Sequence, residues 1–411
     1  MSVLILHRGS LAATPYHEWL APTGAKLLLL ASAEQLDAFG EELPDGAPYV
    51  HTEAVRDYDA DTTWVEDRAA ELIRAHGVTD IVACAERDIE RAALLRERFG
   101  LPGQQPDTAV PYRDKWEMKA AALRAGIPVA EHALVRSAAE VEAFAARHGL
   151  PVVVKPRRGA GSIGLRVLRG AAELSEWAAQ AEYTAPDGEP GWLAEAYVEG
   201  AMCHIDGVVR GGELASIWPS QYRYVLADYT DRGGRVDIAL DAADPMAHRL
   251  IGFGRQVLDA LGGPADFAFH IEVFRTPDDD LVLCEAACRA GGAGVRDLHR
   301  HMFGVDPAQL PVLAQFGLPA EVPGRQAPEP AAGQLAFMMR PGTLHRLPDP
   351  AARPPGVFKQ TYFAAEGDVL EESSHSGNFL AVFLVEGSGR AEVEERIEAL
   401  KGWFLGGLDV H

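Results

Sequence analysis

The feature that most constrains this chain is an apolar strand that ends in a lysine and runs into a glycine-rich loop. The segment reads PVVVKPRRGAGSIGLRV, with Lys155 at the end of the expected strand and Gly159, Gly161 and Gly164 in the loop. Glycines let backbone N–H groups approach phosphate oxygens, and Ser162 and Lys155 add a hydroxyl and a point charge. The lysine precedes the glycines, so the segment does not match a Walker P-loop. Taken alone, the loop is more often a glycine-rich hairpin with an incidental lysine.

Two strands further along the chain carry a facing pair of acids. Alternation in FAFHIEVF places His270 and Glu272 on one face, and pairing with LVLCEAAC about the turn TPDDD sets Glu272 nearly opposite Glu285. Carboxylates directly across a sheet repel each other, and Mg²⁺ bound to both and to phosphate oxygens would relieve the repulsion. Arg289 follows closely and is placed to reach the same phosphates. An exposed hairpin with solvated glutamates is the alternative interpretation.

Length and composition favour a globular protein of several domains. The 411 residues suffice for about two to four modules, and 47% hydrophobic and 24% charged residues are typical of soluble proteins. A net charge of −22 argues against a nucleic-acid or membrane-surface partner. The start, MSVLILHRGS, predicts a strand rather than a signal peptide, and no apolar run approaches the ~18 residues that span a bilayer, so we expect a cytoplasmic protein. The four cysteines lack paired metal-binding spacing and are expected to be reduced and buried.

The first hundred residues alternate strand and helix patterns. VLIL, KLLLLAS and DIVACA predict strands, while TTWVEDRAAELIRAHG and the segment ending at Phe99-Gly100 predict helices. This rhythm is typical of a doubly wound parallel sheet. Residues 101–113 hold three prolines and little pattern and predict a linker, after which a new unit is expected near Asp114.

From Asp114 onward the pattern is that of α+β lobes. A helix, a strand after Pro128, a helix over 138–147 and the strand PVVVKP predict a first lobe. The strands WLAEAYV, CHIDGVVR and ELASIW, a helix over 245–261 and the two acid-bearing strands predict a second. After the proline-rich PGRQAPEP, the strands QLAFMMR, GVFKQTYFA and NFLAVFLVEG and a helix from Ala391 predict a last block.

In their order along the chain, these motifs resemble the ATP-grasp superfamily. Asp114-Lys115, GIPV, PVVVKP with its glycine loop, EAYV, and the acids Glu272 and Glu285 with R-A-G-G span roughly residues 80–300. The family includes D-alanine–D-alanine ligase, biotin carboxylase and bacterial L-amino-acid (dipeptide) ligases. The resemblance implies an α/β and α+β fold with a Rossmann-like N-terminal domain over 1–112, a small ATP-grasp lobe over 113–198, a large lobe over 199–325 and a C-terminal α+β block over 326–411.

The resemblance also implies roles for individual residues. Lys115 and Lys155 resemble the two lysines that contact the ATP phosphates, and Glu272 and Glu285 resemble the metal-binding acids. Arg289 resembles the arginine that stabilises the acyl phosphate. The remaining candidate ATP-binding residues belong to a flap over 158–164 and to a hinge that reads the adenine edge: Arg158, Gly161, Ser162, Ile163, Glu195, Ala196, Tyr197 and Val198.

Two positions depart from the family pattern. Many members carry E-x-N-x-R at the second acid, whereas Ala287 stands between Glu285 and Arg289 here, so either a water replaces that metal ligand or the second Mg²⁺ is held less tightly. Bacterial dipeptide ligases resemble this chain in having an alanine there, which favours amino-acid ligation. Met202 stands where many members have the acid that holds the ribose hydroxyls.

Substrate contacts are expected near the metal-binding face. His270 is a candidate catalytic residue there, and the run SSHSGN over 373–378 is a further candidate. Arginines suit a free carboxylate and glycines permit close backbone approach, although each such residue alone is more often structural. His204, among apolar strand residues, is expected to be a hydrogen-bonded histidine rather than a ligand. The candidate substrate residues are Arg289, Gly291, Gly292, Arg296, Tyr222 and Arg223.

The resemblance implies an ATP-dependent, ADP-forming carbon–nitrogen ligase. A carboxylate attacks the γ-phosphorus of ATP, and an amine then displaces phosphate from the acyl phosphate. The expected cofactors are ATP and Mg²⁺, with Mn²⁺ as a substitute, and the expected partners are a small-molecule carboxylate and amine and a second copy in a homodimer. The alternatives are a carrier-bound or larger amine or thiol acceptor, a use of bicarbonate like that of biotin carboxylase, and a non-catalytic nucleotide-binding regulatory protein.

Overall fold

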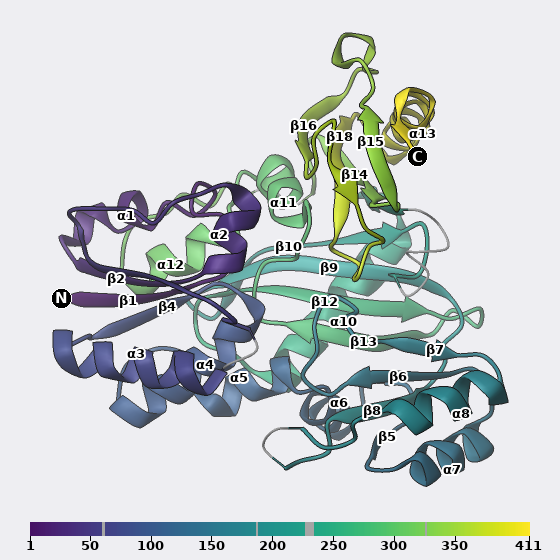
Figure 1. The fold of residues 1–411 in the computed structure, drawn as a ribbon, viewed down its shortest axis with the longest axis horizontal. Coiled ribbons are helices and arrows are strands. Elements are labelled where there is room, and N and C mark those ends of the chain that lie inside the picture. The colour runs from purple at the N-terminus through teal and green to yellow at the C-terminus, as the bar shows by residue number, and fades with distance from the viewer. Residues whose placement is uncertain (60–61, 186–187, 227–233, 325–326) are drawn as a thin grey trace.

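The computed structural model describes residues 1–59, 62–185, 188–226, 234–324 and 327–411. In Figure 1 an N-terminal layered domain lies on the left, a small lobe lies at the lower right, and one large sheet runs between them. The expected mixed architecture, a parallel-sheet domain followed by two α+β lobes, is confirmed.

The N-terminal domain is a parallel sheet with helices on both faces. Its strands run in the order β3-β2-β1-β4, and β1 and β2 read as continuous apolar runs because both of their faces are buried. α3 and α4 cover one face, while α1, α2 and α12 cover the other (Figure 1). The elements are β1 Ser2–His7, β2 Lys26–Ser32, β3 Tyr49–Val55, β4 Asp80–Ala83, α1 Tyr16–Trp19, α2 Ala33–Phe39, α3 Thr62–His76, α4 Glu86–Phe99 and α12 Gln309–Gln315.

The sequence analysis did not predict four elements of this region, α1, α2, β3 and α5 (Pro106–Arg113), and the last two show the physical reason most clearly. β3, with the sequence YVHTEAV, lies at the edge of the sheet and is mostly half-buried, so it lacks the apolar run that marks its neighbours. The predicted linker over 101–113 is wrong in its second half, because Pro106–Arg113 form α5. Pro106 suits the first turn of a helix, where its missing N–H needs no partner. Tyr112 is buried and donates its hydroxyl to the carbonyl of Gly262 at 2.6 Å, so tertiary packing stabilises a helix with a weak local pattern.

The small lobe is an antiparallel sheet of four strands in the order β5-β8-β6-β7. α7 and α8 lie on the side of this sheet that faces away from the large sheet (Figure 1). Asp114 caps α6 by accepting the backbone N–H of Trp116 at 3.0 Å, which fixes where Lys115 begins the helix. The elements are α6 Lys115–Arg124, β5 His132–Val135, α7 Ala138–His148, β6 Val152–Pro156, β7 Arg166–Leu168, α8 Ala171–Gln180 and β8 Trp192–Ala196.

The large sheet has eight antiparallel strands in the order β13-β12-β9-β10-β11-β14-β18-β16. The main strands of the expected C-terminal block over 326–411 therefore continue the sheet of the large lobe rather than forming a separate one, because β14 pairs with β11. The elements are β9 Ala201–Arg210, β10 Glu213–Tyr222, β11 Gly234–Ala239, α10 Pro245–Leu261, β12 Phe267–Arg275, β13 Leu281–Ala287, α11 Val295–Phe303, β14 Ala331–Met338, β16 Val357–Tyr362, β18 Phe379–Gly387 and α13 Arg390–Gly407.

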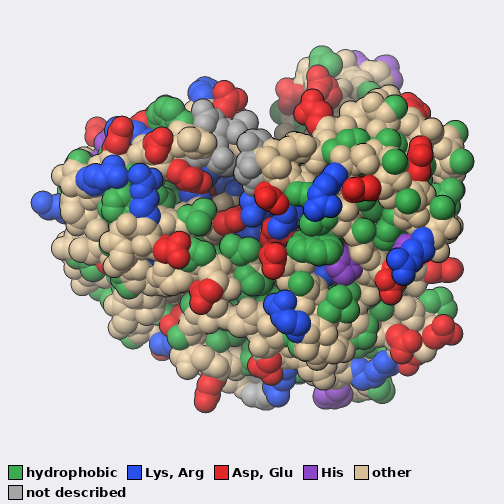
Figure 2. All heavy atoms as spheres, turned by 90° about the horizontal axis from the view of Figure 1, so that it is seen from below, with side chains coloured by type: hydrophobic (Ala, Val, Ile, Leu, Met, Phe, Trp, Pro, Cys, Tyr) green, Lys and Arg blue, Asp and Glu red, His purple; other side chains and the backbone are tan. Residues whose placement is uncertain are grey.

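The rest of the C-terminal region is a small sheet of three strands, β17-β15-β19, beside α13. Its strands are β15 Gly342–Arg346, β17 Val369–Leu370 and β19 Asp409–Val410. On the face of the molecule shown in Figure 2, basic and acidic side chains are interspersed, and the described residues of that face form no continuous basic strip. None of the helices within the described residues has the length and apolar character of a bilayer-spanning segment.

Candidate functional site

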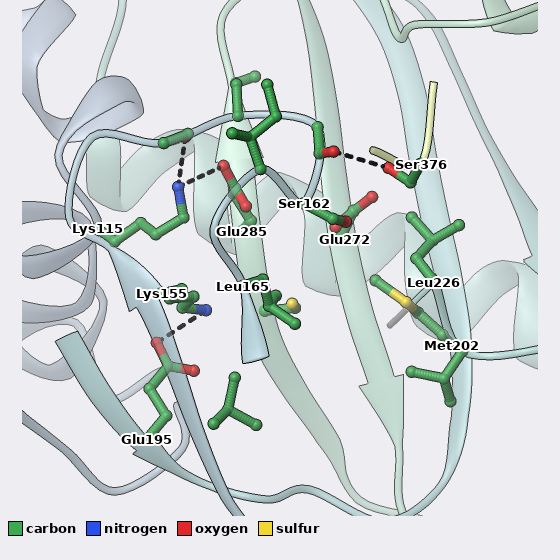
Figure 3. A pocket seen from close by; sticks show the side chains of 18 of the residues that line it. Lys115, Lys155, Ser162, Leu165, Glu195, Met202, Leu226, Glu272, Glu285 and Ser376 are labelled. Atoms are coloured by element: carbon green, nitrogen blue, oxygen red, sulfur yellow. Dashed lines mark hydrogen bonds and ion pairs between the residues drawn. The ribbon is translucent and has the colours of Figure 1, made fainter. Parts of the chain in front are cut away.

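A pocket lies between the small lobe and the large sheet, beneath the glycine-rich loop that follows β6 (Figure 3). β6, β7 and β8 contribute one wall, and β9, β11, β12 and β13 contribute the other. The predicted site residues that line it are Lys115, Lys155, Gly161, Ser162, Ile163, Glu195, Ala196, Tyr197, Val198, His270, Glu272, Glu285, Arg289 and Gly292.

The two acids predicted to bind metal are direct partners across β12 and β13. Glu272 and Glu285 pair in the antiparallel register, and both side chains line the pocket. Glu285 Oε1 lies 3.0 Å from Lys115 Nζ, and Glu272 Oε1 accepts from the Tyr222 hydroxyl at 3.4 Å. Burial opposes ionisation of Glu272, but His270 outweighs it and holds its pKa below the ordinary value. Two carboxylates that open onto one cavity are a donor set that fits Mg²⁺.

Lys155 shares one buried acid with a second lysine. Glu195 Oε1, on β8, lies 2.9 Å from Lys155 Nζ and 3.1 Å from Lys119 Nζ, and all three side chains are buried. Burial opposes ionisation of Glu195, but the two ammonium groups outweigh it and lower its pKa to about 2. The side chain of this hinge residue therefore holds Lys155 at the pocket wall.

The glycine-rich loop is held from two sides. Gly161 and Ser162 have φ angles of 63° and 60°, in the left-handed region that only glycine adopts without strain. Lys115 Nζ donates to the carbonyl of Gly159 at 2.7 Å. From the C-terminal region, Ser376 donates its backbone N–H at 3.3 Å and its hydroxyl at 3.0 Å to the carbonyl of Gly161. Figure 3 shows Lys115 and Ser376 on opposite sides of this loop.

Arg289 is oriented by the N-terminal domain. Its Nε donates to Glu86 Oε2 at 2.5 Å, and its Nη1 donates to the carbonyl of Ala290 at 2.7 Å. Glu86 begins α4 and also accepts from Arg113 at the end of α5. Burial opposes ionisation of Glu86, but Arg289 and Arg113 outweigh it and lower its pKa to about 2. The position of Arg289 in the pocket thus depends on contacts with a different domain.

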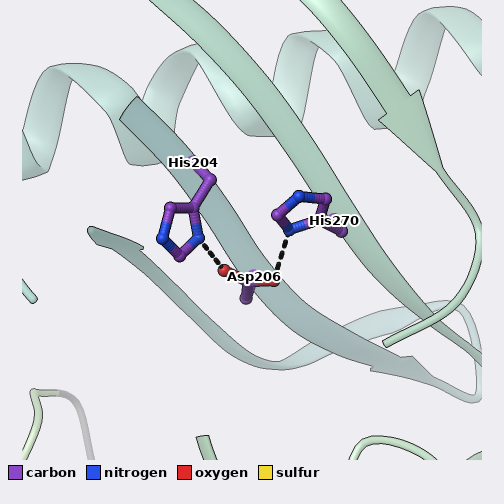
Figure 4. Close-up of side chains that lie close together, drawn as sticks. All are labelled: His204, Asp206 and His270. Atoms are coloured by element: carbon purple, nitrogen blue, oxygen red, sulfur yellow. Dashed lines mark hydrogen bonds and ion pairs between the residues drawn. The ribbon is translucent and has the colours of Figure 1, made fainter. Parts of the chain in front are cut away.

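His270 belongs to a buried hydrogen-bonded cluster with His204 and Asp206 (Figure 4). The two oxygens of Asp206 lie 2.5 Å from His204 Nδ1 and 2.8 Å from His270 Nδ1. His204 Nε2 lies 3.2 Å from Asp237 Oδ2, and His270 Nε2 lies 3.4 Å from Glu272 Oε1. The three residues have potential metal-ligand atoms within 4.8 Å of one another, yet these atoms are already bonded to each other. The cluster is therefore typical of a network that orients Glu272, and His204 is hydrogen-bonded as expected.

Two predicted substrate residues lie away from the pocket. Arg296, on α11, pairs with Asp306 at 2.7 Å in the groove between α11 and the N-terminal domain. Arg223 pairs with Glu398 of α13. Each guanidinium pairs with a nearby carboxylate outside the pocket. The structure therefore does not bring these two arginines to the pocket.

Three further predicted residues lie beside the pocket and do not line it. Tyr222 is buried and reaches the site only through its hydroxyl on Glu272. Gly291 is packed so closely that an added Cβ would meet Val295 Cγ1 at 2.5 Å, which is a structural reason for glycine. Arg158 Nε lies 3.4 Å from an oxygen of Asp114, at the base of the loop.

The two departures from the family pattern both face the pocket. Met202 lines it together with other apolar side chains, so the wall near the hinge is apolar and suits a flat ring. Ala287 also lines it and offers no ligand atom beside Glu285. The apolar lining residues on this side are Val153, Val167, Met202, Val225, Leu226 and Phe274.

The sequence analysis missed several residues of the site. Glu86 begins the helix that follows the parallel strand β4, near the carboxyl end of the sheet where ligand-contacting residues are common, so it could have been found. Lys119 stands four residues after Lys115 on one helix face, which is a weaker signal. Arg235 comes from a segment remote from every motif, and no local pattern marks it, whereas Ser376 belongs to the run over 373–378 that the sequence analysis named as a candidate.

Comparisons with known proteins place this geometry in context. The family described as "Carbamoyl-phosphate synthase L chain, ATP binding domain" matches residues 114–210. An L-arginine-specific L-amino acid ligase of Bacillus subtilis is 23% identical over 333 residues, 78% of either chain. An alanine–anticapsin ligase of Bacillus subtilis is 24% identical over 399 residues, 88% of this chain and 83% of that one. The crystal structure of an L-amino acid ligase from Bacillus licheniformis superposes with a TM-score of 0.78 at 18% identity, covering 100% of this chain and 99% of that one, so the two share a fold.

Proposed function

Because the chain belongs to the ATP-grasp carboxylate–amine ligases, we propose that it joins two small molecules, with amino acids as the first candidates for both. The enzyme phosphorylates a carboxylate with ATP and couples the acyl phosphate to an amine, which forms an amide or peptide bond and releases ADP and phosphate. The resemblance to two amino-acid ligases of Bacillus subtilis and the alanine at position 287 support this substrate class.

One observation carries the proposal: groups for phosphate, metal and acyl phosphate meet in a single pocket. Lys115 and Lys155 enter from the small lobe, and Glu272, Glu285 and Arg289 enter from the large sheet and its following turn. A cavity with cations at one end and paired carboxylates beside them matches the charge of a metal–nucleotide complex.

The side chains have separable roles in this proposal. Phosphoryl transfer depends mainly on positioning and charge neutralisation, so no nucleophilic side chain is required. Lys115 and Lys155 hold phosphate oxygens, and Arg289 stabilises the acyl phosphate and the tetrahedral intermediate. When bound to Glu272 and Glu285, Mg²⁺ would neutralise charge on the phosphates. The loop over 158–164 closes the pocket against water, which would otherwise hydrolyse the acyl phosphate.

Three finer points are part of the same proposal. Mn²⁺ replaces Mg²⁺ because carboxylate oxygens are suitable ligands for both ions, and replacement of one metal by the other in the activity assay tests this. The protein forms a homodimer and resides in the cytoplasm, which sedimentation of the purified protein and localisation of a tagged chain would test.

The first experiment is phosphate release from ATP and Mg²⁺ with the twenty proteinogenic L-amino acids, singly and in pairs. Wild type is compared with Glu285→Ala and with Asp278→Ala, an exposed acid in the turn between the same two strands. We expect release that depends on a particular pair, that disappears in Glu285→Ala and that persists in Asp278→Ala.

The other outcomes are equally informative. Release with a single amino acid that yields no homodipeptide would indicate an acceptor outside the panel, such as a carrier-bound or larger amine. No release with any amino acid, together with calorimetric binding of ADP, would contradict the proposal and favour a nucleotide-binding regulatory protein.

A further inference from the structure

One face of the large sheet changes from polar to apolar inside the pocket, at the pair formed by Met202 and Phe274. These two residues are direct partners on the antiparallel strands β9 and β12, and both line the pocket. The next pair on the same face, two residues away on each strand, is His204 and Glu272. The face therefore passes from hydrogen-bonded, ionisable side chains to apolar side chains within a single step along the strands.

The opposite wall of the pocket changes in the same way. Lys155 and Val153 both line the pocket from β6, where side chains two residues apart share one face. Figure 3 shows Met202 across the pocket from Lys115. A nucleotide with its phosphates among the lysines and acids and its base against the apolar wall has its ribose where the two parts of the pocket meet, beside Glu272 and Met202.

The described part of the lining leaves no carboxylate for this ribose. Carboxylates are the side chains that commonly accept hydrogen bonds from ribose hydroxyls. The described lining holds three of them, Glu195, Glu272 and Glu285. Glu195 is held by two lysines, and Glu272 and Glu285 are the pair that fits a metal ion. Met202, which is 4% exposed, offers only a thioether, whose sulfur is a weak acceptor.

An apolar contact at the ribose has a consequence for nucleotide specificity. A site that hydrogen-bonds a hydroxyl strongly rejects an analogue without it, because the buried polar group of the protein then loses its partner. An apolar side chain loses no partner when the hydroxyl is missing, so it discriminates weakly between the two ligands. The wall formed by Met202 and Phe274 belongs to the second kind.

We propose that Met202 and Phe274 face the ribose of the bound nucleotide, and that the enzyme therefore uses 2′-deoxy-ATP and 3′-deoxy-ATP as well as ATP. This inference rests on the proposed function, because it takes ATP as the nucleotide. It names Met202 as the residue that sets the sugar specificity, and it widens the nucleotide substrates to adenine nucleotides that lack a ribose hydroxyl.

The test begins with calorimetric titration of the wild-type protein, in the presence of Mg²⁺, with ADP, 2′-deoxy-ADP and 3′-deoxy-ADP. The Kd values should agree within about two-fold, because no hydrogen bond to the protein differs among these ligands. Steady-state phosphate release with the most active pair of amino acids should give KM values for ATP and 2′-deoxy-ATP that agree equally well. This part of the test uses only the wild-type protein, so it does not depend on whether a variant folds.

Substitutions at position 202 test the assignment to this residue. Met202→Gln adds an acceptor without placing a charge beside Glu272, so it should bind ADP about five-fold more tightly than 2′-deoxy-ADP, as expected for one net hydrogen bond. Met202→Leu stays apolar and should bind both with equal affinity. The matched control is Ala201→Gln, which places the same side chain on the other face of β9, outside the pocket lining, and should also bind both equally.

Each remaining outcome has one meaning. Binding of ADP by the wild type more than about ten-fold tighter than either deoxy-ADP would overturn the inference, because it would reveal a hydrogen-bonding partner for the ribose. Equal affinities in a Met202→Gln variant that binds ADP as tightly as wild type would overturn the assignment of Met202 to the ribose. Equal binding of all these nucleotides without pair-dependent phosphate release would support the inference and remove the proposed substrates.

Discussion

At the scale of single residues, the site depends on acids that are not themselves ligands. Glu86 holds Arg289 and Arg113, and Glu195 holds Lys155 and Lys119. In each case one buried carboxylate keeps two cations from repelling each other, and the cations lower its pKa to about 2. Removing such an acid leaves charges buried without a partner, which costs about 3–5 kcal/mol in comparable pairs.

We predict that Glu86→Gln lowers kcat about ten-fold or more while ADP binding changes little. The amide keeps the shape of the side chain but no longer anchors Arg289 as a charge, so the arginine loses its orientation toward the reacting group. Steady-state phosphate release and calorimetric titration of ADP measure the two quantities.

The matched control is Glu97→Gln, an exposed acid on the same helix. It should leave both quantities unchanged. A loss of ADP binding in Glu86→Gln equal to the loss of kcat would show that Glu86 supports the whole pocket rather than Arg289.

At the scale of elements, the glycine-rich loop and the C-terminal segment over 373–378 form one closed arrangement. The segment is ordered by its own bonds, since Ser373 donates its hydroxyl to the carbonyl of Asn378 at 2.7 Å and accepts the N–H of Met339 at 2.9 Å. Ser376 then meets the carbonyl of Gly161 with two donors. A preformed partner reduces the entropy lost when the loop closes.

We predict that Ser376→Ala uncouples ATP hydrolysis from amide formation. Loss of the hydroxyl removes the 3.0 Å bond to the carbonyl of Gly161, so the loop closes less firmly and water reaches the acyl phosphate. The ratio of phosphate released to amide formed should rise about two-fold or more above one, as expected for a net hydrogen-bond loss of about 1 kcal/mol. Ser374→Ala, an exposed neighbour, should keep the ratio at one, and a ratio of one in Ser376→Ala would show that the contact does not govern closure.

At the scale of the whole molecule, one sheet connects the nucleotide-binding region to the C-terminus. The strands β9 to β18 form a continuous layer, and α11 packs against it from the turn that follows Arg289. His299 of α11 lies between these elements at 2% exposure, 2.8 Å from the hydroxyl of Ser216 on β10. Burial lowers its pKa from 6.5 to about 4, so the folded protein keeps this imidazole neutral.

This burial predicts a pH dependence of stability. Below pH 6.5 His299 is protonated in the unfolded chain, whereas in the folded chain it stays neutral down to about pH 4. The contribution of the neutral, buried imidazole to the free energy of unfolding is therefore complete above pH 6.5 and decreases as the pH falls toward 4. The free energy of unfolding should fall by up to about 3 kcal/mol across this window. Urea unfolding at several pH values measures this free energy.

His299→Gln should be less stable than wild type at pH 7, and its free energy of unfolding should decrease less steeply as the pH falls. The control His248→Gln, at an exposed position, should follow wild type. An equal pH dependence in all three proteins would contradict the assignment of this effect to His299.

Local patterns were sufficient for most elements of this chain. The helix over 245–261 and the two acid-bearing strands were predicted because their apolar residues recur with a helical or an alternating period over enough residues to be unambiguous. The pairing of Glu272 with Glu285 follows from the short turn between the two strands, which sets their register. Among the elements that were not predicted, α5 and β3 depend on what they pack against rather than on a pattern of their own.

The sequence by itself determined the order of the modules, the facing acids and the glycine-rich loop, because these depend on residues close together in the chain. Only the tertiary structure decided that Arg235 and Ser376 line the pocket, that Glu86 holds Arg289 from behind it, and that Arg223 and Arg296 lie elsewhere. These side chains come together because strands distant in the chain pair in one sheet and three modules close around it. Local periodicity in the sequence does not predict these contacts, since they arise from packing between residues far apart in the chain.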